Sequence, residues 1–333
     1  MAQPAVRSRH TVLLTAVVAA GVAAGVLPFE APAAAAYPQR AIRLIIPYPP
    51  GGAGDIIGRI LAARLGEAMG QQVVADNRPG GGQVIATQLT ARANPDGYTL
   101  LLASATHTIN PGLLKKLPYD SIRDFSAITV VADSPLLFLA HPSLGVASIQ
   151  ELVAAAHARP GRINYASSGP GTGGHLSVEL LKRMTNIDLV HIPYKGAGPA
   201  LVDLVSGQVQ VMCTSPLPSL PHVRAGRLKG LAMTGRARSS AAPEIPTVAE
   251  SGVPGYESTL WYALLAPAAT PQPVMRRLHA ETVKAIRLPG VVEQISALGA
   301  QPIGSTPQEV TKFLQSEITR WTRLIEQAGI RAD

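Results

Sequence analysis

Four segments rich in glycine or hydroxyl residues are the places where this sequence could do chemistry. They span residues 48–55, 104–110, 167–175 and 193–198. Glycine lets a ligand approach the backbone closely, and the free N–H groups and dipole at the start of a following helix favour a carboxylate or a phosphate. These residue types therefore predict an anion receptor.

Three side chains in these segments have both a structural and a ligand-binding interpretation. Asp55 could cap the helix that follows it, contact a ligand amine or hydroxyl, or do both. Lys195 could neutralise a bound anion or be a lysine of a surface loop. Tyr48 precedes two prolines that fix its backbone direction, so it either walls a pocket or covers the core.

Nucleotide-binding and catalytic motifs do not fit the same segments. Residues 51–54 lack the third glycine of a dinucleotide fingerprint, and residues 169–175 lack the Gly-Lys-Ser/Thr ending of a phosphate loop. Ser168 lacks the glycine two positions earlier that a nucleophile elbow needs, while His175 could assist a serine or be a structural partner. No histidines have zinc-ligand spacing. We expect neither a cofactor nor a metal.

Alternating strand and helix patterns would position these segments. An apolar run at 41–47 leads into Ile57, Leu61, Leu65 and Met69, which recur at helical spacing. The same patterns predict strands at 72–76, 98–103, 163–166, 189–192, 209–213 and 228–233, and helices at 84–93 and from the glycines at 169–174 onward. Such alternation predicts mostly parallel sheets with helices on both faces, and ligands bind at the carboxyl ends of their strands.

Two helices carry start signals of their own. Ser148 and Glu151 form a capping box ahead of a helix that ends before Pro160. Thr306 and Glu309 flank a proline in a second capping box. One apolar stripe follows it, so that long helix must pack on the rest of the fold; the stripe comprises Val310, Phe313, Leu314, Ile318, Trp321 and Ile325.

Residues 1–36 have the features of a secretory signal. Arg7, Arg9 and His10 precede an apolar run at 12–27, and small residues suited to signal peptidase follow it. The alternative, a membrane anchor, needs about 20 apolar residues, more than this run offers. These small residues predict cleavage near Ala36. No cysteine lies at the end of the signal to carry a lipid, so we expect an exported product without a lipid anchor.

The composition excludes several classes of protein. The 333 residues are 47% hydrophobic and 15% charged with one cysteine, which rules out a disordered chain and a disulfide scaffold. We expect Cys213 to be a small core residue, with a nucleophile as the alternative. The net charge of +8 is spread in short clusters with few aromatic residues, so nucleic acid is not an expected partner. This charge could steer small anions or simply be solvated.

Several motifs together carry a resemblance to a known family. They are YP at 37–38, IRLIIPYPPGG at 42–52, DNRPG at 76–80, NPDGYT at 94–99, LPYD at 117–120, YASSGPGTGGHL at 165–176, HIPYKG at 191–196, RAGRL at 224–228 and PTVAE at 246–250. From Tyr37 to its end, the chain resembles the substrate-binding receptors of tripartite tricarboxylate transporters, the Bug-type periplasmic solute-binding proteins.

This resemblance implies an α/β type II periplasmic-binding-protein fold, in which two lobes close on a solute in the cleft between them. Residues 37–140 with 260–333 would form the first lobe, and residues 141–259 the inserted second lobe. The chain would cross between the lobes near Ala140 and Leu260. Hinge closure on the ligand would create the state that a permease recognises.

The resemblance also implies where the solute binds. The family holds a carboxylate through backbone groups and ordered waters, and commonly has Phe where Tyr48 stands, so the extra hydroxyl would alter the far end of the pocket. The candidate ligand-binding residues are Tyr48, Gly51, Gly52 and Asp55 on one side, Ser168, Gly169 and Thr172 on the other, and Ser104, Thr106 and Asn110 at the border of the cleft. His175 and Lys195 complete the set.

The implied function is a periplasmic receptor, a monomer that binds a small organic carboxylate and delivers it to integral-membrane permease subunits. Two alternatives remain. One is an exported enzyme on the same bilobal frame that uses Ser168 with His175 or Cys213. The other is a receptor that feeds a sensor kinase.

Substitution of Ser168 separates the enzyme from the receptor. In an enzyme, the loss of the nucleophile abolishes turnover. In a receptor, the same change only weakens the affinity for the ligand. Assays of turnover and of binding on one Ser168→Ala preparation distinguish the two.

Overall fold

A computed structural model describes residues 1–2 and 37–331. Nearly all of the predicted signal at 1–36 therefore lies outside the described residues. Contacts divide the chain into two compact units, Met1–Tyr37 and Pro38–Asp333, and the fold below is that of the second.

Two β-sheets organise this unit. The first has the strand order β11-β4-β10-β3-β1-β2, with β1 at Ile42–Ile46, β2 at Val73–Asn77, β3 at Thr99–Ser104, β4 at Phe125–Pro135, β10 at Thr259–Pro267 and β11 at Gln301–Pro302. The second has the order β7-β6-β8-β5-β9, with β5 at Leu137–Ala140, β6 at Asn164–Ser167, β7 at Val190–Pro193, β8 at Val211–Thr214 and β9 at Lys229–Met233. The prediction of a two-lobed α/β fold is confirmed.

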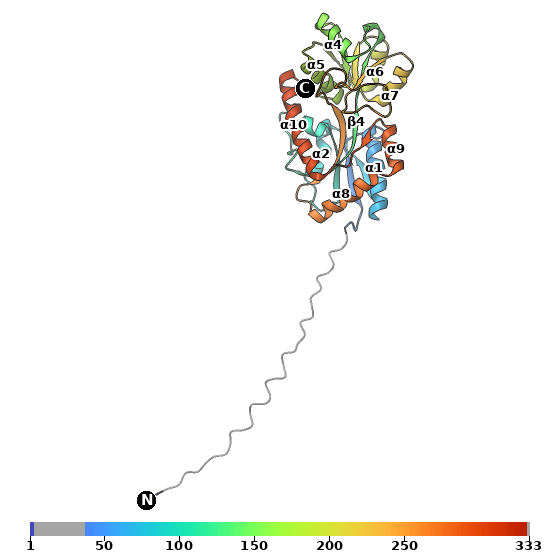
Figure 1. Cartoon of the computed structure of the whole chain (residues 1–333). Coiled ribbons are helices and arrows are strands. Elements are labelled where there is room, and N and C mark those ends of the chain that lie inside the picture. Colours follow the sequence, from blue (N-terminus) through green and yellow to red (C-terminus); the bar gives the residue numbers. More distant parts are fainter. Residues whose placement is uncertain (3–36, 332–333) are drawn as a thin grey trace. The chain divides into compact units, whose positions relative to one another are not determined.

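Helices connect most of the strands (Figure 1). They are α1 at Ala53–Met69, α2 at Val84–Ala91, α3 at Thr106–Leu113, α4 at Ile149–Ala158, α5 at Gly173–Thr185, α6 at Ala197–Val205, α7 at Pro216–Arg224, α8 at Gln272–Ile286, α9 at Pro289–Ala297 and α10 at Pro307–Ala328, with short 3₁₀ turns η1 at Gly81–Gln83 and η2 at Pro142–Leu144. The predicted helix after β1 is α1, whose residues Ile57, Leu61, Leu65 and Met69 are all buried. Gly70 ends α1 in the left-handed conformation, at φ 67°.

The prediction of mostly parallel sheets is wrong. Strand β1 pairs in parallel with β2 and β3, and β6 pairs in parallel with β7 and β8. In contrast, β10 is antiparallel to both β3 and β4, and β5 is antiparallel to both β8 and β9. The first strand that the chain forms after each passage between the sheets, β5 or β10, runs antiparallel to its neighbours. Both sheets are therefore mixed.

The chain passes between the sheets twice. It leaves the first sheet at the end of β4 and enters the second with β5, so Leu136 lies between the two. It returns between Met233, the last residue of β9, and Thr259, the first of β10. The lobe boundaries near Ala140 and Leu260 stay a prediction.

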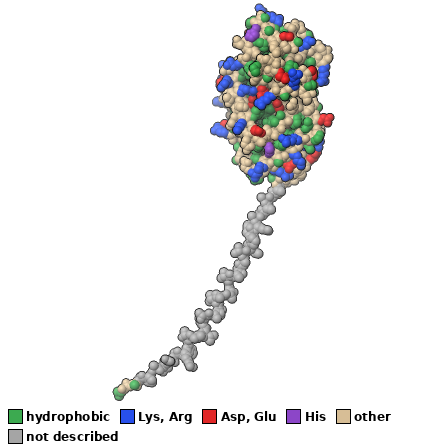
Figure 2. Space-filling view, in the orientation of Figure 1, with side chains coloured by type: hydrophobic (Ala, Val, Ile, Leu, Met, Phe, Trp, Pro, Cys, Tyr) green, Lys and Arg blue, Asp and Glu red, His purple; other side chains and the backbone are tan. Residues whose placement is uncertain are grey.

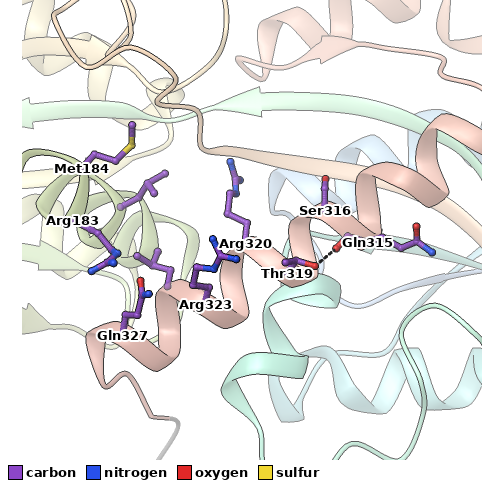
Figure 3. A pocket seen from close by; sticks show the side chains of 10 residues that line it. Arg183, Met184, Gln315, Ser316, Thr319, Arg320, Arg323 and Gln327 are labelled. Carbon is purple, nitrogen blue, oxygen red and sulfur yellow. Dashed lines mark hydrogen bonds between the residues drawn. The ribbon is translucent and has the colours of Figure 1, made fainter.

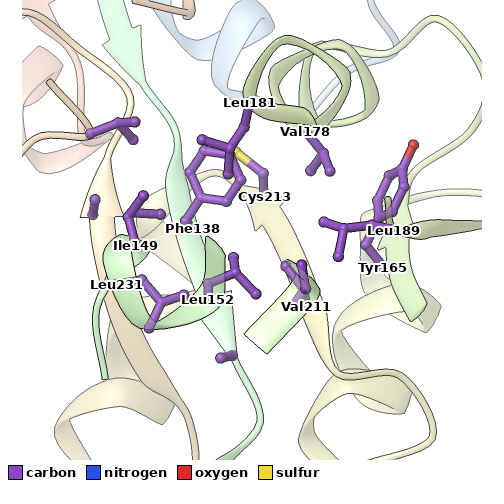
Figure 4. Packing of buried hydrophobic residues seen from close by; sticks show 14 of the residues in the cluster. Phe138, Ile149, Leu152, Tyr165, Val178, Leu181, Leu189, Val211, Cys213 and Leu231 are labelled. Atoms are coloured by element: carbon purple, nitrogen blue, oxygen red, sulfur yellow. The ribbon is translucent and has the colours of Figure 1, made fainter. Parts of the chain in front are cut away.

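Each sheet has its own hydrophobic core. In the first, Trp261 and Trp321 are buried with apolar residues of β3 and α10. In the second, Phe138, Tyr165 and Cys213 pack with Leu and Val side chains (Figure 4). Cys213 is 1% exposed, and burial raises the pKa of its thiol well above the usual value, which agrees with its interpretation as a core residue.

The predicted caps form, one of them in a modified way. At α10, Thr306 Oγ1 accepts from the Glu309 N–H while the Glu309 carboxylate accepts from the Thr306 N–H. At α4, Ser148 Oγ accepts from the Glu151 N–H, but the Glu151 carboxylate accepts from the N–H of Ala147 and not of Ser148. Both helices therefore have a donor satisfied by a side chain at their start.

The surface carries charges of both signs. Figure 2 shows Lys and Arg side chains spread over the visible face and interspersed with Asp and Glu. Among the described residues, no helix combines the length and the hydropathy needed to cross a bilayer.

The start of α5 gives a stability prediction. A Cβ at Gly174, the second residue of α5, would lie 2.2 Å from the carbonyl oxygen of Cys213 in β8. We expect Gly174→Ala to lower the free energy of unfolding by about 2 kcal/mol, because backbone must move to make room. Urea denaturation measures this cost.

Gly198 provides the matched control. It is the second residue of α6, and a Cβ there would meet no atom within 4 Å. Gly198→Ala should leave the stability within about 1 kcal/mol of the wild type. Equal losses in both variants would contradict the assignment of a tight α5–β8 contact.

Candidate functional site

Asp55 organises the loop between β1 and α1. Its carboxylate accepts hydrogen bonds from the Gly51 N–H at 2.9 Å, from Asn77 Nδ2 at 2.8 Å and from Arg59 Nε at 3.0 Å. Asn77 Nδ2 also donates to the carbonyl oxygen of Tyr48 at 2.9 Å. The buried carboxylate thus ties the loop to α1 and to the end of β2.

These partners also set the charge state of Asp55. Burial alone would raise the pKa of this carboxyl, but the hydrogen bonds from Arg59, Gly51 and Asn77 outweigh burial and hold the pKa below its usual value. Asp55 is therefore an ionised group that is already fully engaged. Its position is the third residue of α1, not the N-cap, which is Gly52.

The first turn of α1 presents unused backbone donors. Gly52 is the N-cap, and no side chain in the described part of the chain caps this helix. A Cβ at Gly51 or Gly52 would meet nothing within 4 Å, so open space adjoins the loop. Gly51 has φ 94° and donates its own N–H to Asp55. The N–H groups of Gly52, Ala53 and Gly54 remain for a ligand.

The end of β3 and the start of α3 lie beside this loop. Ser104 Oγ donates to Gln83 Oε1 at 2.8 Å, and both side chains lie beside the Tyr48 hydroxyl. Asn110 is buried and donates to the carbonyl oxygen of Gly82 at 2.9 Å, so it holds η1 against α3. Thr106 is the half-buried first residue of α3. The structure thus brings Tyr48 and Ser104 together.

The loop between β6 and α5 forms the second glycine-rich turn. Gly169 has φ 136°, donates its N–H to Ser167 Oγ at 3.1 Å and accepts from Thr172 Oγ1 at 2.8 Å. Thr172 is the N-cap of α5, yet its hydroxyl does not cap the helix. The N–H groups of Gly173 and Gly174 therefore remain the donors at this end, while Ser168 is half-buried beside them.

His175 hydrogen-bonds the backbone of the same turn. Its Nδ1 accepts from the Gly171 N–H at 3.0 Å, and its ring stacks on His191 with 3.9 Å between centroids. His191 Nε2 lies 2.6 Å from Ser167 Oγ, and the Tyr165 ring stacks near both histidines, with centroids 4.9 Å from His191 and 6.1 Å from His175. His175 is thus a structural partner of the loop, and its Nδ1 has no hydrogen bond to Ser168.

Burial keeps both histidines neutral. Burial, the neighbouring His191 and the charge of Lys182 lower the pKa of His175 to about 3. Burial and Lys182 also lower the pKa of His191, although Glu179 acts in the opposite direction. Because a backbone N–H can only donate, Nδ1 of His175 must be unprotonated while it accepts from Gly171.

Packing places the second turn against α3. A Cβ at Gly171 would lie 2.5 Å from the Leu113 side chain, and one at Gly173 would lie 2.5 Å from Leu260. Asn110 lies one turn before Leu113 on α3, so the turn that carries Gly171 approaches the helix that holds η1. Lys195 is an exposed residue before α6, and it makes no ion pair among the described residues.

Three residues that sequence reasoning missed take part in this arrangement: Asn77, Gln83 and His191. Asn77 and His191 lie within the family motifs, but their roles depend on contacts between distant segments. Gln83 follows three consecutive glycines. This is the one local sign in the sequence that its backbone adopts an unusual conformation.

A separate groove of about 530 Å³ lies between α5 and α10. Arg183, Arg320 and Arg323 point along it, and Met184 lies at its side (Figure 3). None of the candidate ligand-binding residues lines this groove. Within the described part of the chain, no cluster of three or more His, Cys, Asp or Glu side chains could hold a metal ion.

Comparison with known proteins identifies the family. Residues 57–330 match the family described as tripartite tricarboxylate transporter family receptor. The chain belongs to this family. BugT of Bordetella pertussis is 38% identical over 297 residues, covering 89% of this chain and 91% of BugT. The Bug-type resemblance is thereby confirmed.

Two solved receptors share both sequence and fold with this family member. R. palustris Rpa4515 with adipate has a TM-score of 0.76 at 34% identity, covering 89% of this chain and all of that one. MatC from Rhodopseudomonas palustris with bound malate has a TM-score of 0.72 at 30% identity, covering 87% of this chain and all of that one.

The histidine stack makes the stability pH-dependent. The pKa of His175 in the folded chain lies below the unfolded value of 6.5, so the unfolded chain takes up a proton first as the pH falls. Stability should therefore decline from about pH 6.5 downward, by up to about 1.4 kcal/mol per pH unit for each such histidine. The buried His107, whose pKa is lowered to about 4 by burial, adds to the same decline.

Urea denaturation between pH 7 and pH 5 tests this. His175→Asn keeps an acceptor near the position of Nδ1 but removes the proton uptake, so its stability should fall less steeply with pH than the wild type. His157→Asn, at an exposed position of α4, is the control and should keep the wild-type slope. An unchanged slope in His175→Asn would show that this histidine is not held neutral.

Proposed function

We propose that the chain is a periplasmic receptor that binds a small organic carboxylate between its two lobes and delivers it to integral-membrane permease subunits. The observation that carries this proposal is the pair of glycine-rich helix starts, α1 and α5, whose first N–H groups have no side-chain cap. Uncapped N–H groups and the helix dipole favour an anion. Among the described α-helices only α4 and α10 have a side-chain cap, so what sets α1 and α5 apart is that their uncapped starts follow glycine-rich turns at the ends of the parallel strands β1 and β6.

The relatives support a carboxylate as the anion. Rpa4515 carries adipate and MatC carries malate, and both align with nearly the whole of this chain beyond its first residues. Gly52, Thr172 and Ser168 are then ligand contacts, with Gly51, Gly169 and Asp55 as the groups that shape the two turns. Thr106 and Lys195 border the entrance in this proposal.

The geometry favours a receptor over an enzyme. Ser168 lacks a histidine partner among the described residues, because His175 Nδ1 is engaged by Gly171. Ser167 does contact His191, but its side chain is fully buried and bonded to the Gly169 N–H. The Cys213 thiol lies in the core with its pKa raised by burial. No cofactor is part of the proposal, and the receptor acts as a monomer after removal of residues 1–36.

Lobe closure gives the permease a state to recognise. The ligand stabilises the closed form by as much as it prefers that form over the open one. In this proposal the lobe built on the first sheet moves against the lobe built on the second, through the two passages between the sheets. A sensor kinase in place of a permease would read the same closure.

A charge at the start of α1 tests the carboxylate site. Gly52→Asp places a carboxylate at an N-cap with φ −83°, a position where Asp is favourable, so the fold should survive. The added charge repels the bound anion by about 1–4 kcal/mol at 4 Å, so the affinity should fall at least about tenfold. Isothermal titration calorimetry with malate and adipate measures it.

Gly290 is the control for this variant. It is the exposed second residue of α9, with open space around its Cα, so Gly290→Asp adds the same charge at another helix start. Its affinity should equal that of the wild type. Unchanged affinity in Gly52→Asp would place the ligand elsewhere.

A further inference from the structure

Gln83 has a backbone conformation that its residue type disfavours. Its φ is 71°, and among the described residues only Gln83, Asn186 and Ala269 have a positive φ without being glycine. Asn186 closes α5, a position where asparagine is common. Glycine would fit the position of Gln83 without strain, so the glutamine side chain must contribute something that glycine cannot.

The Gln83 side chain belongs to a partly buried polar cluster, in which Gln83 and Tyr48 are half-buried and Ser104 is buried. Gln83 Oε1 accepts from Ser104 Oγ at 2.8 Å, and the Tyr48 hydroxyl lies beside both side chains. Tyr262 packs edge-on against Tyr48 with 6.2 Å between ring centroids, and it is paired with Ser104 across β10 and β3. Four polar side chains from four segments thus meet at the carboxyl ends of β1 and β3.

This cluster adjoins the free N–H groups of α1. The Tyr48 ring lies over Gly54, where a Cβ would come within 2.5 Å of it. Gly54 is the second residue of α1 and one of the uncapped donors. A ligand whose carboxylate reaches α1 therefore has its remaining atoms within reach of Tyr48 and Gln83.

The cluster is neutral and can both donate and accept hydrogen bonds. Its members are hydroxyl groups and a primary amide. The carboxylate of Asp55, in the segment that follows Tyr48, already accepts hydrogen bonds from Gly51, Arg59 and Asn77. An oxygen-bearing group would hydrogen-bond the Tyr48 hydroxyl and the Gln83 amide, whereas a hydrocarbon or aryl tail would displace water from these half-buried groups without replacing its hydrogen bonds, which is costly.

We propose that Gln83, together with Tyr48 and Ser104, selects ligands that carry a hydroxyl, oxo or second carboxylate group at the end away from the bound carboxylate. This inference rests on the proposed function, since it assigns the far end of the same site. Aliphatic and aromatic monocarboxylates are the ligands that the cluster rejects.

Matched acids test the selection. Succinate and butyrate share a chain length, as do adipate and hexanoate, and each pair differs only in the far carboxylate. The wild type should bind one or both diacids at least about tenfold more tightly than the matched monoacid. In Gln83→Gly, which accepts φ 71° without strain, that preference should fall at least about tenfold, because the diacid loses a hydrogen-bond partner and the monoacid no longer desolvates the Gln83 amide.

Two further variants serve as a second probe of the cluster and as a control. Tyr48→Phe retains the ring packing on Gly54 and Tyr262 but lacks the hydroxyl, so it should also reduce the preference. Asn186→Gly makes the same backbone change away from this cluster and should leave the preference intact. Titration calorimetry and urea midpoints on all three variants separate ligand selection from folding.

The outcomes separate the two proposals. If the wild type binds diacids and Gln83→Gly and Tyr48→Phe keep its full preference, the selector role is overturned and the carboxylate receptor stands. If the wild type binds monoacids as tightly as diacids, the selector role is also overturned. If no acid binds the wild type, both proposals fall.

Discussion

The structure depends on keeping backbone N–H groups open at the starts of α1 and α5. A side chain can satisfy these donors, as Ser148 and Thr306 do for α4 and α10, although the other eight α-helices of the described chain start without such a cap. At α1 and α5 no described side chain does so. Nearby polar side chains instead fix the preceding turns: Asp55 accepts a hydrogen bond from the Gly51 N–H, and His175 accepts one from the Gly171 N–H. The two turns are therefore held in place before an anion binds, which lowers the conformational cost of binding.

Local patterns predicted much of the fold because each pattern reports on nearby residues. The apolar spacing from Ile57 to Met69 and the capping box at Thr306 correspond to α1 and α10 as observed. Such local patterns do not indicate whether two paired strands run parallel or antiparallel. Residues 125–135 pair with residues 259–267 in antiparallel fashion, and this pairing joins segments that are far apart in the sequence. The mixed sheets therefore appear only in the three-dimensional structure.

The candidate site shows the same division. Glycine-rich segments at the ends of strands predict a site there, because glycine and helix starts act locally, and this location stays a prediction. Which N–H groups remain free depends on bonds such as Asp55 to Gly51 and Ser167 to Gly169, and the sequence does not display these bonds. Gln83 escaped notice for a related reason: its neighbours Ser104 and Tyr48 lie in segments about 20 or more residues away in the sequence. Its positive φ becomes evident only in the structure.

The central claim is that a small carboxylate binds to the folded chain. A thermal-shift screen of residues 37–333 against mono-, di- and tricarboxylates, amino acids and aromatic acids tests it most directly. A micromolar binder at millimolar concentration should stabilise the fold by about 4 kcal/mol. The account predicts a large shift with one class of carboxylate, and recovery of that acid chemically unchanged. No shift with any acid, or conversion of the acid to a product, would contradict the account.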